Sequence, residues 1–345
     1  MLGDSPQVFG SGVGSMIERH GSNFPYQCVA DELKAHDITL ANLEIPVSGY
    51  DSKSTPFEKK IYRTQPHAID GLAAAGVDIV SACTNHMMQH GLPGLKETLD
   101  TLNKAGISVI GIEMPERNTV NRLVVKRKSM RFALLGYNFR PQQYFVAPPQ
   151  WKEPSLELMK SEVAAVRDET DVVIVTLHWG DEFIEFPAPD QVKLARELID
   201  SGVNIVIGHH THIVQGVEKY NGGVIAYSLG NFVYDQWQRQ LRRSMILKLN
   251  VRRPDDIDFE IIPVMINKYH QPQIVTGDEG DALKHEIAAL ADRIGTVDSE
   301  TYRAELDRNY RKFRREVYTH YLTHAFTYKP GDLLANLLGA IRRRV

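Results

Sequence analysis

The sequence is poor in cysteine and has no long apolar run. Its two cysteines, Cys28 and Cys83, cannot build a disulfide framework and fall short of a thiolate zinc site. No segment reaches the roughly 18–20 apolar residues of a membrane span, and no basic segment followed by an apolar one opens the chain. As the sequence stands we expect a soluble, cytoplasmic protein. If an N-terminal segment has been lost, we expect a membrane-anchored or extracytoplasmic one.

A strong charge of either sign is also missing. The formal net charge is −3, which gives no basic footprint for nucleic acid. The signatures of a nucleophilic-serine elbow, a P-loop and a dinucleotide-binding turn are absent as well. Hydrophobic residues make up 43% of the chain, enough for one large α/β domain with an accessory element or for two modest domains.

The sequence does contain an alternation of short β-rich runs and amphipathic helical segments over its first two thirds. Gly76, Gly106 and Gly202 stand where a helix should end and the chain should turn into the next strand. This pattern predicts an α/β fold with substantial parallel pairing. The expected strands are 37–43, 77–83, 109–112, 131–136, 171–177, 203–207 and 224–227, and the expected helices are 26–36, 66–75, 92–105, 156–168 and 190–201.

The pattern changes after Asn250. Residues 251–265 are predicted to form one or two strands around a turn, and 271–280 to form a polar connector. From residue 281 apolar residues recur at helical spacing, so we expect 281–345 to be a helical extension of a domain that spans 1–270. Its charged residues are interpreted as a solvated helix face, with a basic surface for an anionic partner as the alternative.

Metal-binding side chains follow four of the predicted strands, in segments 42–44, 84–86, 178–180 and 209–212. The carboxyl ends of the strands in an open α/β sheet form one edge, where ligands bind. We therefore expect these four segments to converge on a single site. The candidate ligands are nitrogen and oxygen atoms without thiolate, which suits one or two Mn, Fe or Zn ions.

Individual residue types in these segments suggest individual roles. His210 and His212 form a His-x-His pair, and alternate side chains of an extended segment share one face, so both imidazoles can meet one ion. Glu44 offers a bridging carboxylate, with a turn cap before the next proline as the alternative. Asn85 offers a neutral oxygen, and the adjacent His86 is suited to general acid or base work because imidazole titrates near neutrality.

Five motifs, in order along the chain to about Asp235, carry a family resemblance. They are Asn-Leu-Glu-Ile-Pro (42–46), Thr-Asn-His (84–86), His-Trp-Gly-Asp-Glu (178–182), Gly-His-His-Thr-His with Gln-Gly-Val-Glu (208–218) and Tyr-Ser-Leu-Gly-Asn-Phe (227–232). Together they resemble the CapA family of capsule or poly-γ-glutamate biosynthesis proteins, which belongs to the calcineurin-like metallophosphoesterase superfamily. The resemblance implies an α/β sandwich of two β-sheets flanked by helices, with a two-metal site at the strand ends.

The resemblance also implies residue roles. Glu44 would bridge the metals. Asn85, His178 and His210 would ligate one metal and His212 the other. His86, with Asn85 beside it, would act on the leaving group or on the charge of the transition state. Residues expected to contact the substrate or support the ligands are Asn42, Arg63, Trp179, Glu182, His209 and Asn231.

Two departures from the family pattern affect this expectation. The family opens with a strand that ends in Gly-Asp, whose Asp binds the first metal. Here Met1-Leu2-Gly3 resembles the continuation of that motif, so we expect the strand and its Gly-Asp upstream of residue 1, and Asp4 is a poor substitute. The family also has an Asp three residues after its Asn-His, where this chain has Gln89, and His90 replaces an aromatic residue.

The expected function is that of a metal-dependent hydrolase of capsule or poly-γ-glutamate metabolism. A metal-bound hydroxide would attack a small-molecule or polymer substrate that carries phosphoester or amide links. The alternative is a non-catalytic or weakly catalytic component of a polymer-synthesis or export assembly, in which the metal is structural and the C-terminal helices dock partners. A TIM-barrel amidohydrolase also uses His-x-His at a strand end, but at its first strand rather than late in the chain.

Overall fold

The computed structural model describes residues 1–50, 62–114, 116, 121–140, 147–327, 331 and 334. The described residues include a six-stranded sheet with the order β4-β5-β6-β7-β9-β8, in which β5, β6, β7 and β9 run parallel and the outer strands β4 and β8 run antiparallel to their neighbours. Its strands are β4 (Arg122–Arg127), β5 (Met130–Asn138), β6 (Val172–His178), β7 (Ile205–His209), β8 (Val217–Tyr220) and β9 (Gly223–Ala226).

Two three-stranded sheets pack against one face of this large sheet. One is parallel, with the order β1-β2-β3, and the other is antiparallel, with the order β10-β11-β12. In the described part of the chain, β1 pairs within its sheet only with β2, and β10 pairs with β11 and, through an isolated bridge at Ser244, with Gly230. The strands are β1 (Leu40–Asn42), β2 (Ile79–Ser81), β3 (Ser108–Ile110), β10 (Arg243–Arg253), β11 (Asp256–Ile266) and β12 (Pro272–Ile274).

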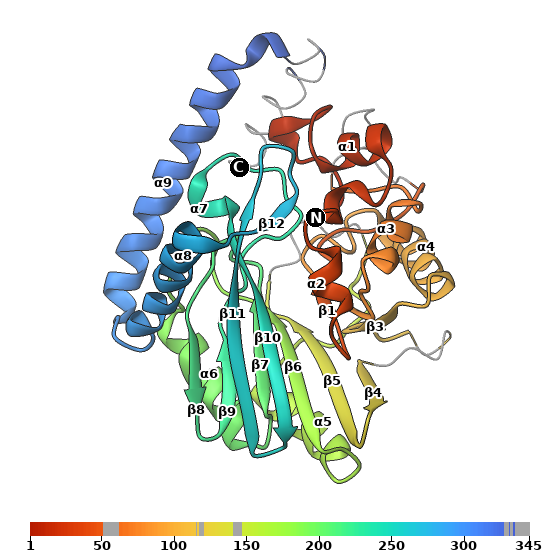
Figure 1. The fold of residues 1–345 in the computed structure, drawn as a ribbon, viewed down its shortest axis with the longest axis vertical. Coiled ribbons are helices and arrows are strands. Elements are labelled where there is room, and N and C mark those ends of the chain that lie inside the picture. Colours follow the sequence, from red (N-terminus) through yellow and green to blue (C-terminus); the bar gives the residue numbers. More distant parts are fainter. Residues whose placement is uncertain are drawn as a thin grey trace.

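Helices cover the outer faces of the sheets (Figure 1). The helices on the β1-β2-β3 side are α1 (Val13–His20), α2 (Ala30–Lys34), α3 (Ala68–Ala74) and α4 (Gly91–Lys104). The helices on the outer face of the large sheet are α5 (Leu156–Arg167) and α6 (Pro189–Asp200). A short helix, α7 (Arg239–Arg242), leads into β10. The layers are therefore helix, sheets, sheet and helix, which confirms the predicted two-layer α/β sandwich flanked by helices.

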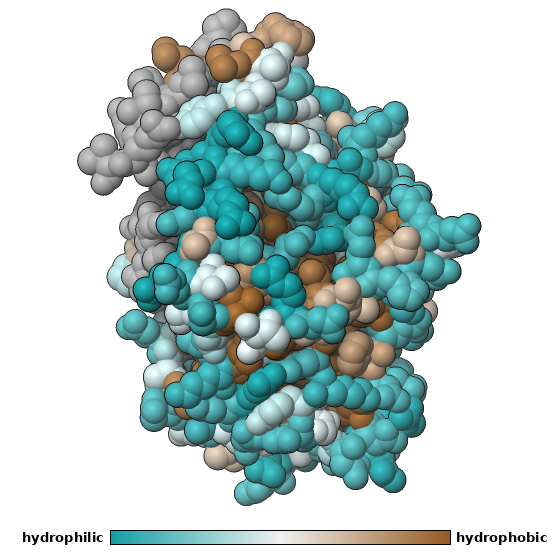
Figure 2. Space-filling model, turned by 90° about the vertical axis from the view of Figure 1, so that its left-hand side faces the viewer, coloured by the Kyte–Doolittle hydropathy of each residue, from teal (hydrophilic) through white to brown (hydrophobic). Residues whose placement is uncertain are grey.

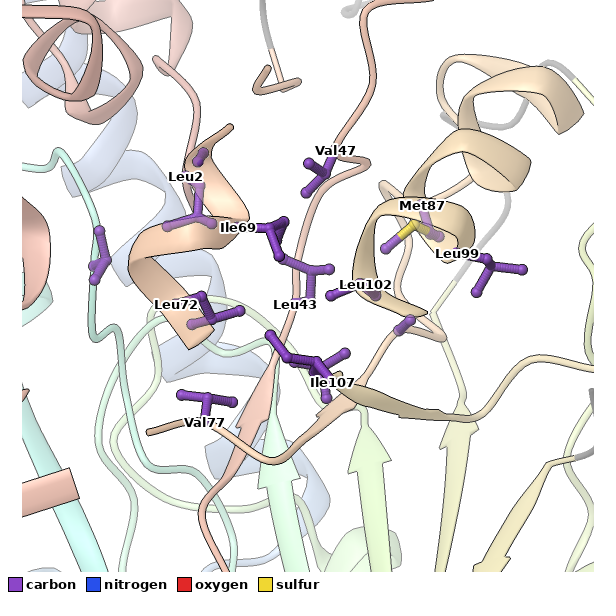
Figure 3. Packing of buried hydrophobic residues seen from close by; sticks show 14 of the residues in the cluster. Leu2, Leu43, Val47, Ile69, Leu72, Val77, Met87, Leu99, Leu102 and Ile107 are labelled. Carbon is purple, nitrogen blue, oxygen red and sulfur yellow. The ribbon is translucent and has the colours of Figure 1, made fainter. Parts of the chain in front are cut away.

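Successive side chains of one strand enter two different apolar cores, an outer core between the β1-β2-β3 sheet and its helices and a core between the facing sheets. Val80 packs with the helices in the outer core, whereas its neighbour Ile79 packs between the sheets, as the two-residue period of a strand requires. Figure 3 shows Leu43 between Ile69 of α3 and Leu102 of α4 in the outer core. Strand β6 is buried on both faces, which explains its unbroken apolar sequence up to Thr176.

The C-terminal helices contact the main body rather than extending away from it. Helix α8 (Gly277–Ala289) contributes Leu283 and Ile287 to the core between the sheets. Helix α9 (Ser299–Thr323) lies along the side of the molecule and packs Tyr302 edge-on against Phe186 (Figure 1). No helix among the described residues combines the length and the apolar character needed to cross a bilayer. Figure 2 shows a mainly hydrophilic face on which apolar residues are visible in the hollows.

Most predicted elements are confirmed with shifted ends, and some predictions were wrong. The three glycines expected at helix ends, at positions 76, 106 and 202, all have positive φ. The strand expected to start at residue 251 begins at Arg243, because the turn near Pro254 lies in the middle of a long hairpin. The expected polar connector at 271–280 contains β12 and the first turn of α8. The sequence pattern missed α1, β4 and β8.

Candidate metal centre

Three buried side chains form the centre of the candidate site. Ligand-type atoms of Glu44, His178 and His210 all lie within 4.8 Å of one another. The three residues are 7%, 2% and 5% exposed. Glu44 follows β1 by two residues, His178 ends β6, and His210 directly follows β7. Residues far apart in the chain are therefore brought together at the ends of strands.

The way in which strands assemble the site differs from the prediction. A single sheet edge was expected, but β1 and β2 belong to one sheet and β6 and β7 to another. The inner faces of these sheets share one apolar core, with Ile79 on one side and Ile174 and Ile207 on the other. Because the sheets face each other, the carboxyl ends of both strand pairs reach the same place.

Unpaired polar atoms show that the residues fit a divalent cation. Among the described residues, Glu44 Oε1, His178 Nδ1 and both ring nitrogens of His210 are buried without a hydrogen-bond partner. Each such atom costs about 1–3 kcal/mol when it stays unsatisfied. A cation bound between them would satisfy several at once, and this nitrogen and oxygen donor set suits Mn, Fe or Zn.

The protonation states of His210 and Glu44 also fit a metal site. Burial lowers the pKa of His210 well below its ordinary value, so the ring is neutral near pH 7. Burial alone would raise the pKa of Glu44, but the neighbouring His178, with His212 and His86, outweighs it, and the pKa lies well below its ordinary value. A carboxylate next to a neutral imidazole is the form in which these groups bind metals.

Two asparagines contact the central residues. Asn85 Oδ1 lies 2.9 Å from His178 Nε2, which itself is 3.3 Å from Glu44 Oε1. Asn42 Nδ2 donates to Glu44 Oε2 at 2.8 Å, and Thr84 Oγ1 donates to the Glu44 carbonyl at 2.7 Å. The segments 42–44 and 84–86, which follow β1 and β2, are thus hydrogen-bonded to each other and hold the Glu44 carboxylate in place.

His212 lies beside the centre, but not for the reason expected. Its ring centroid is 5.9 Å from that of His210. The two residues have φ of +60° and +94°, so they do not lie in an extended segment, and β7 already ends at His209. His212 Nδ1 is 2.9 Å from Asn231 Oδ1, and Asn231 Nδ2 donates to the His212 carbonyl at 3.0 Å. A tight turn anchored by Asn231 therefore presents both rings.

His86 is buried next to a neutral partner. Its Nδ1 lies 2.7 Å from Gln89 Oε1, and burial is the main cause that lowers its pKa to about 4. The ring of Tyr62 stacks on it at 4.4 Å between centroids. The departure from the family pattern at residue 89 thus acts directly on His86, and His90 is fully buried close by in the sequence.

The remaining predicted residues have varied surroundings. Glu182 Oε1 lies 4.0 Å from His210 Nε2, at the edge of the centre. His209 is a neutral ring, since burial lowers its pKa to about 3. Trp179 is a core residue whose indole N–H donates to the Tyr227 carbonyl at 3.1 Å, so it supports the strands rather than facing the centre.

Arg63 is held by the loop that follows the first motif. Its Nη1 donates to the carbonyls of Gly49 and Tyr50 at 2.5 and 2.9 Å. Its suggested role as an anion binder stays a prediction.

Sequence reasoning missed three aromatic neighbours of the site. Tyr62 stacks on His86, while Tyr234 and Phe183 lie 5.0 and 6.2 Å from the ring of His212. Tyr234 follows the last motif by two residues and Phe183 directly follows His-Trp-Gly-Asp-Glu, so proximity to a motif was the available signal.

A buried carboxylate–imidazole cluster between two sheets of an α/β sandwich defines a candidate metalloprotein. Comparison with known protein families shows to which family the chain belongs. The family model described as "Bacterial capsule synthesis protein PGA_cap" matches residues 1–236, and the chain belongs to this family. The resemblance drawn from the five motifs is thereby confirmed.

Individual relatives agree with this assignment. The chain is 27% identical over 281 residues to "Capsule biosynthesis protein CapA" of Bacillus anthracis, covering 78% of this chain and 67% of the relative. It is 28% identical over 266 residues to "PGA biosynthesis protein CapA" of Bacillus subtilis, covering 76% and 70%. Among solved structures, a putative 5'-nucleotidase from Staphylococcus aureus has 14% identity and a TM-score of 0.42, covering 64% of this chain and 43% of that one. This structural likeness is too weak to carry an argument.

Proposed function

We propose that the chain is a metal-dependent hydrolase that acts on phosphoester or amide links in capsule or poly-γ-glutamate polymer metabolism. The observation that supports it most is the buried cluster of Glu44, His178 and His210, with several polar atoms that lack hydrogen-bond partners. When bound there, a Mn, Fe or Zn ion polarises an electrophile and makes a nucleophile of water at neutral pH. The printed names of the Bacillus relatives support the polymer context.

The side chains divide into holding and assisting groups in this proposal. Glu44, His178 and His210 would hold the first ion, with Asn85 as a neutral oxygen donor. His212 would hold a second ion, and Glu44 would bridge the two. His86 is the proposed assisting group, since it can hydrogen-bond a departing or charged oxygen. The proposed supporting residues are Asn42, which donates to Glu44, and Asn231, which contacts His212.

The test combines elemental analysis with turnover of simple probes. We expect the purified chain to bind one or two equivalents of Mn, Fe or Zn and to hydrolyse p-nitrophenyl phosphate, bis-p-nitrophenyl phosphate or a γ-glutamyl anilide. His178→Ala should lose both properties. The matched control is His285→Ala, which changes an exposed histidine of α8 and should keep both. A folded chain that takes up no metal would contradict the proposal.

A second candidate function is favoured by the contact of His86 with Gln89. A neutral amide oxygen stabilises the imidazolium form less than a carboxylate would, and a pKa of about 4 leaves His86 mostly unprotonated near neutrality, so it holds few protons to donate. The chain would then be a weakly catalytic or non-catalytic component of a polymer-synthesis assembly with a structural metal. Full metal occupancy without turnover of any probe would support this candidate over the hydrolase.

A further inference from the structure

Arg140 lies just beyond the carboxyl end of β5, beside the strand that carries His178. It follows the last residue of β5 by two positions, and Asn138 of β5 pairs in register with His178 of β6. The amide of Phe139 donates to the His178 carbonyl at 2.9 Å, and the amide of Arg140 donates to Asn138 Oδ1 at 3.0 Å. These contacts place Arg140 among the strand ends that carry the proposed metal ligands, although none of the five sequence motifs contains it.

The guanidinium group of Arg140 is anchored through one of its nitrogens only. Its Nη1 donates to the Gly180 carbonyl and, at 3.3 Å, to Asp181 Oδ1. The other oxygen of Asp181 accepts from the Tyr302 hydroxyl of α9 at 3.1 Å, so this carboxylate is itself held in place. Among the described residues Nε is buried without a hydrogen-bond partner, and Nη2 has no partner either but stays in contact with solvent. The edge formed by Nε and Nη2 is therefore unpaired.

The same edge of two other arginines binds carboxylates in this molecule. Arg196 donates from Nε and Nη2 to the two oxygens of Glu218, at 3.2 and 2.8 Å. Arg252 donates from the same two nitrogens to Asp256, at 2.8 and 2.6 Å. Two parallel N–H groups match the spacing of two oxygens of a carboxylate or a phosphate. Because a buried N–H without a partner costs free energy, the corresponding edge of Arg140 suits an anion from outside the chain.

The unpaired edge is close to the candidate metal centre. Glu182, in the turn that anchors Arg140, has its Oε1 4.0 Å from His210 Nε2. Burial raises the pKa of Glu182, and the charges of His212 and Arg140 oppose this rise. Burial, His178 and then Arg140 lower the pKa of His210. The charge of Arg140 thus acts on residues of the centre, and an anion on its free edge would lie beside the centre.

We infer that Arg140 binds an anionic group of the substrate, a carboxylate or a phosphate, through Nε and Nη2. Nη2 is open to the approaching anion, and Nε gains its partner when the anion docks. The inference rests on the proposed function and adds to it the charge that the substrate carries beside the metal centre. A γ-linked glutamate polymer has a free carboxylate on every residue, so it presents such a group next to each link, whereas a phosphoester presents its own phosphate oxygens.

The test measures binding of inorganic phosphate and of glutarate by titration calorimetry, on the purified chain and again after chelation of metal. Arg140→Ala should bind the preferred anion at least tenfold more weakly than the unchanged chain. Arg140→Lys should lie between the two, because lysine keeps the charge but lacks the two parallel donors. The control is Arg253→Ala, which changes an exposed arginine in the β10–β11 turn and should have no effect. The tighter-binding anion shows whether the edge holds a carboxylate or a phosphate.

Several results would overturn the inference: no binding of either anion to the unchanged chain, equal binding by Arg140→Ala, or equal binding by Arg140→Lys. Thermal unfolding checks that each variant folds, and Arg140→Lys alone decides the matter if Arg140→Ala does not fold. Metal content should be the same in the unchanged chain and both Arg140 variants, and its loss from a folded variant would assign Arg140 to the metal site instead. If no form takes up metal but the difference in anion binding remains, the hydrolase proposal fails and the anion site stands.

Discussion

Asn231 links the turn that carries His212 to the start of the β10 hairpin. Its Oδ1 contacts His212 Nδ1, and its Nδ2 donates to the carbonyls of His212 and Leu241, each at 3.0 Å. A residue that fixes the tautomer and the direction of a ligand ring affects metal affinity without touching the metal. Asn231 is thus expected to matter for binding as well as for folding.

Asn231→Ala should weaken metal binding by about 10–100-fold and destabilise the fold by about 1–3 kcal/mol, because buried partners lose their hydrogen bonds. Metal titration by calorimetry and urea unfolding measure the two effects. The control is Asn103→Ala, at an exposed position in α4. Unchanged metal affinity in Asn231→Ala would show that His212 does not depend on this contact.

Gly208 leaves no room for a side chain just before the His-His pair. An added Cβ would lie 1.9 Å from the Tyr227 carbonyl oxygen and 2.4 Å from Trp179 Nε1. We expect Gly208→Ala to lower stability by at least ~2 kcal/mol, at the upper end for overpacking, measured by urea unfolding. In Gly49→Ala, the control, the nearest atom to the Cβ is 3.6 Å away, so a small effect is expected.

At the scale of residues, the sequence predicted part of the convergence of the candidate ligands for a physical reason. The convergence of His178 and Glu44 was predictable because His178 ends a strand and Glu44 follows one by two residues, a signal that is local in the sequence. The turn of His210 and His212 was not found, since its positive φ values depend on contacts with Asn231, which comes later in the chain. Tyr62 was missed because its stacking on His86 depends on how distant parts of the chain fold together.

Helix α9 reaches the site through the residue after Glu182. Phe313 stacks on Phe183 at 4.0 Å between centroids, and Asn309 Nδ2 donates to the Phe183 carbonyl at 2.9 Å. Phe183 has φ of +68° and its ring faces His212. The helix therefore holds a backbone conformation that is unfavourable for a residue with a side chain.

Asn309→Ala should loosen the segment around Phe183 and weaken metal binding a few-fold with only a small change in Tm, because the helix itself is unaffected. Metal titration and thermal unfolding measure these effects. Lys312→Ala, at an exposed position of the same helix, is the control and should change neither. Equal metal affinity in both variants would show that the contact between α9 and Phe183 does not affect metal binding.

Helix α5 is tied to β5 by a partly buried carboxylate. Burial alone would raise the pKa of Glu162, but hydrogen bonds from Lys152, Tyr137 and Asn121 outweigh it and lower the pKa below its ordinary value of 4.5. A lowered folded-state pKa means that the carboxylate stabilises the fold above pH 4.5, and that this contribution is lost as the pH falls through the folded-state pKa.

Glu162→Gln should therefore lower Tm at pH 7, and the difference from the unchanged chain should shrink as the pH drops below about 4.5. Thermal unfolding across this range measures it. Glu153→Gln, at an exposed position, should show no such trend. A difference that stays constant with pH would mean that the ionised form of Glu162 is not stabilised by folding.

At the scale of elements, burial decides which strands the sequence could predict. Strand β6 is apolar from Val172 to Val175 because both of its faces are covered. Strand β4 lies at a sheet edge and carries Arg122, Lys126 and Arg127, which obscure its alternation. Charged residues protect exposed strand edges from pairing with other chains, so the feature that protects β4 also hides it from pattern analysis.

At the scale of the whole molecule, an ion in the candidate site would connect two sheets. Glu44 comes from the small parallel sheet, and His178 and His210 come from the large one. Ligands that bind only the folded state stabilise it by about 2.7 kcal/mol at 100 times Kd. We expect Mn or Zn to raise Tm and a chelator to reverse the rise. His178→Ala should abolish the shift, and a shift that persists would point to a different site.

The layered arrangement was predictable only in outline. Strand–helix alternation predicted parallel pairing, and β5, β6 and β7 confirm it. The order within the large sheet was not predictable, because β9 pairs with β7 and leaves β8 outside. The division of parallel strands between facing sheets depends on which apolar faces meet, and this is a property of the packed molecule rather than of any segment.

The position of the three central residues along the chain has a consequence for synthesis in the cell. Glu44 leaves the ribosome early, whereas His178 and His210 follow only after most of the α/β region has been translated. A nascent chain that stops before residue 210 carries the carboxylate without its imidazole partners. In the proposed metal-dependent protein, an ion held by all three residues would therefore bind only after residue 210 has been translated, so metal supply would affect a step that follows synthesis of both strand pairs.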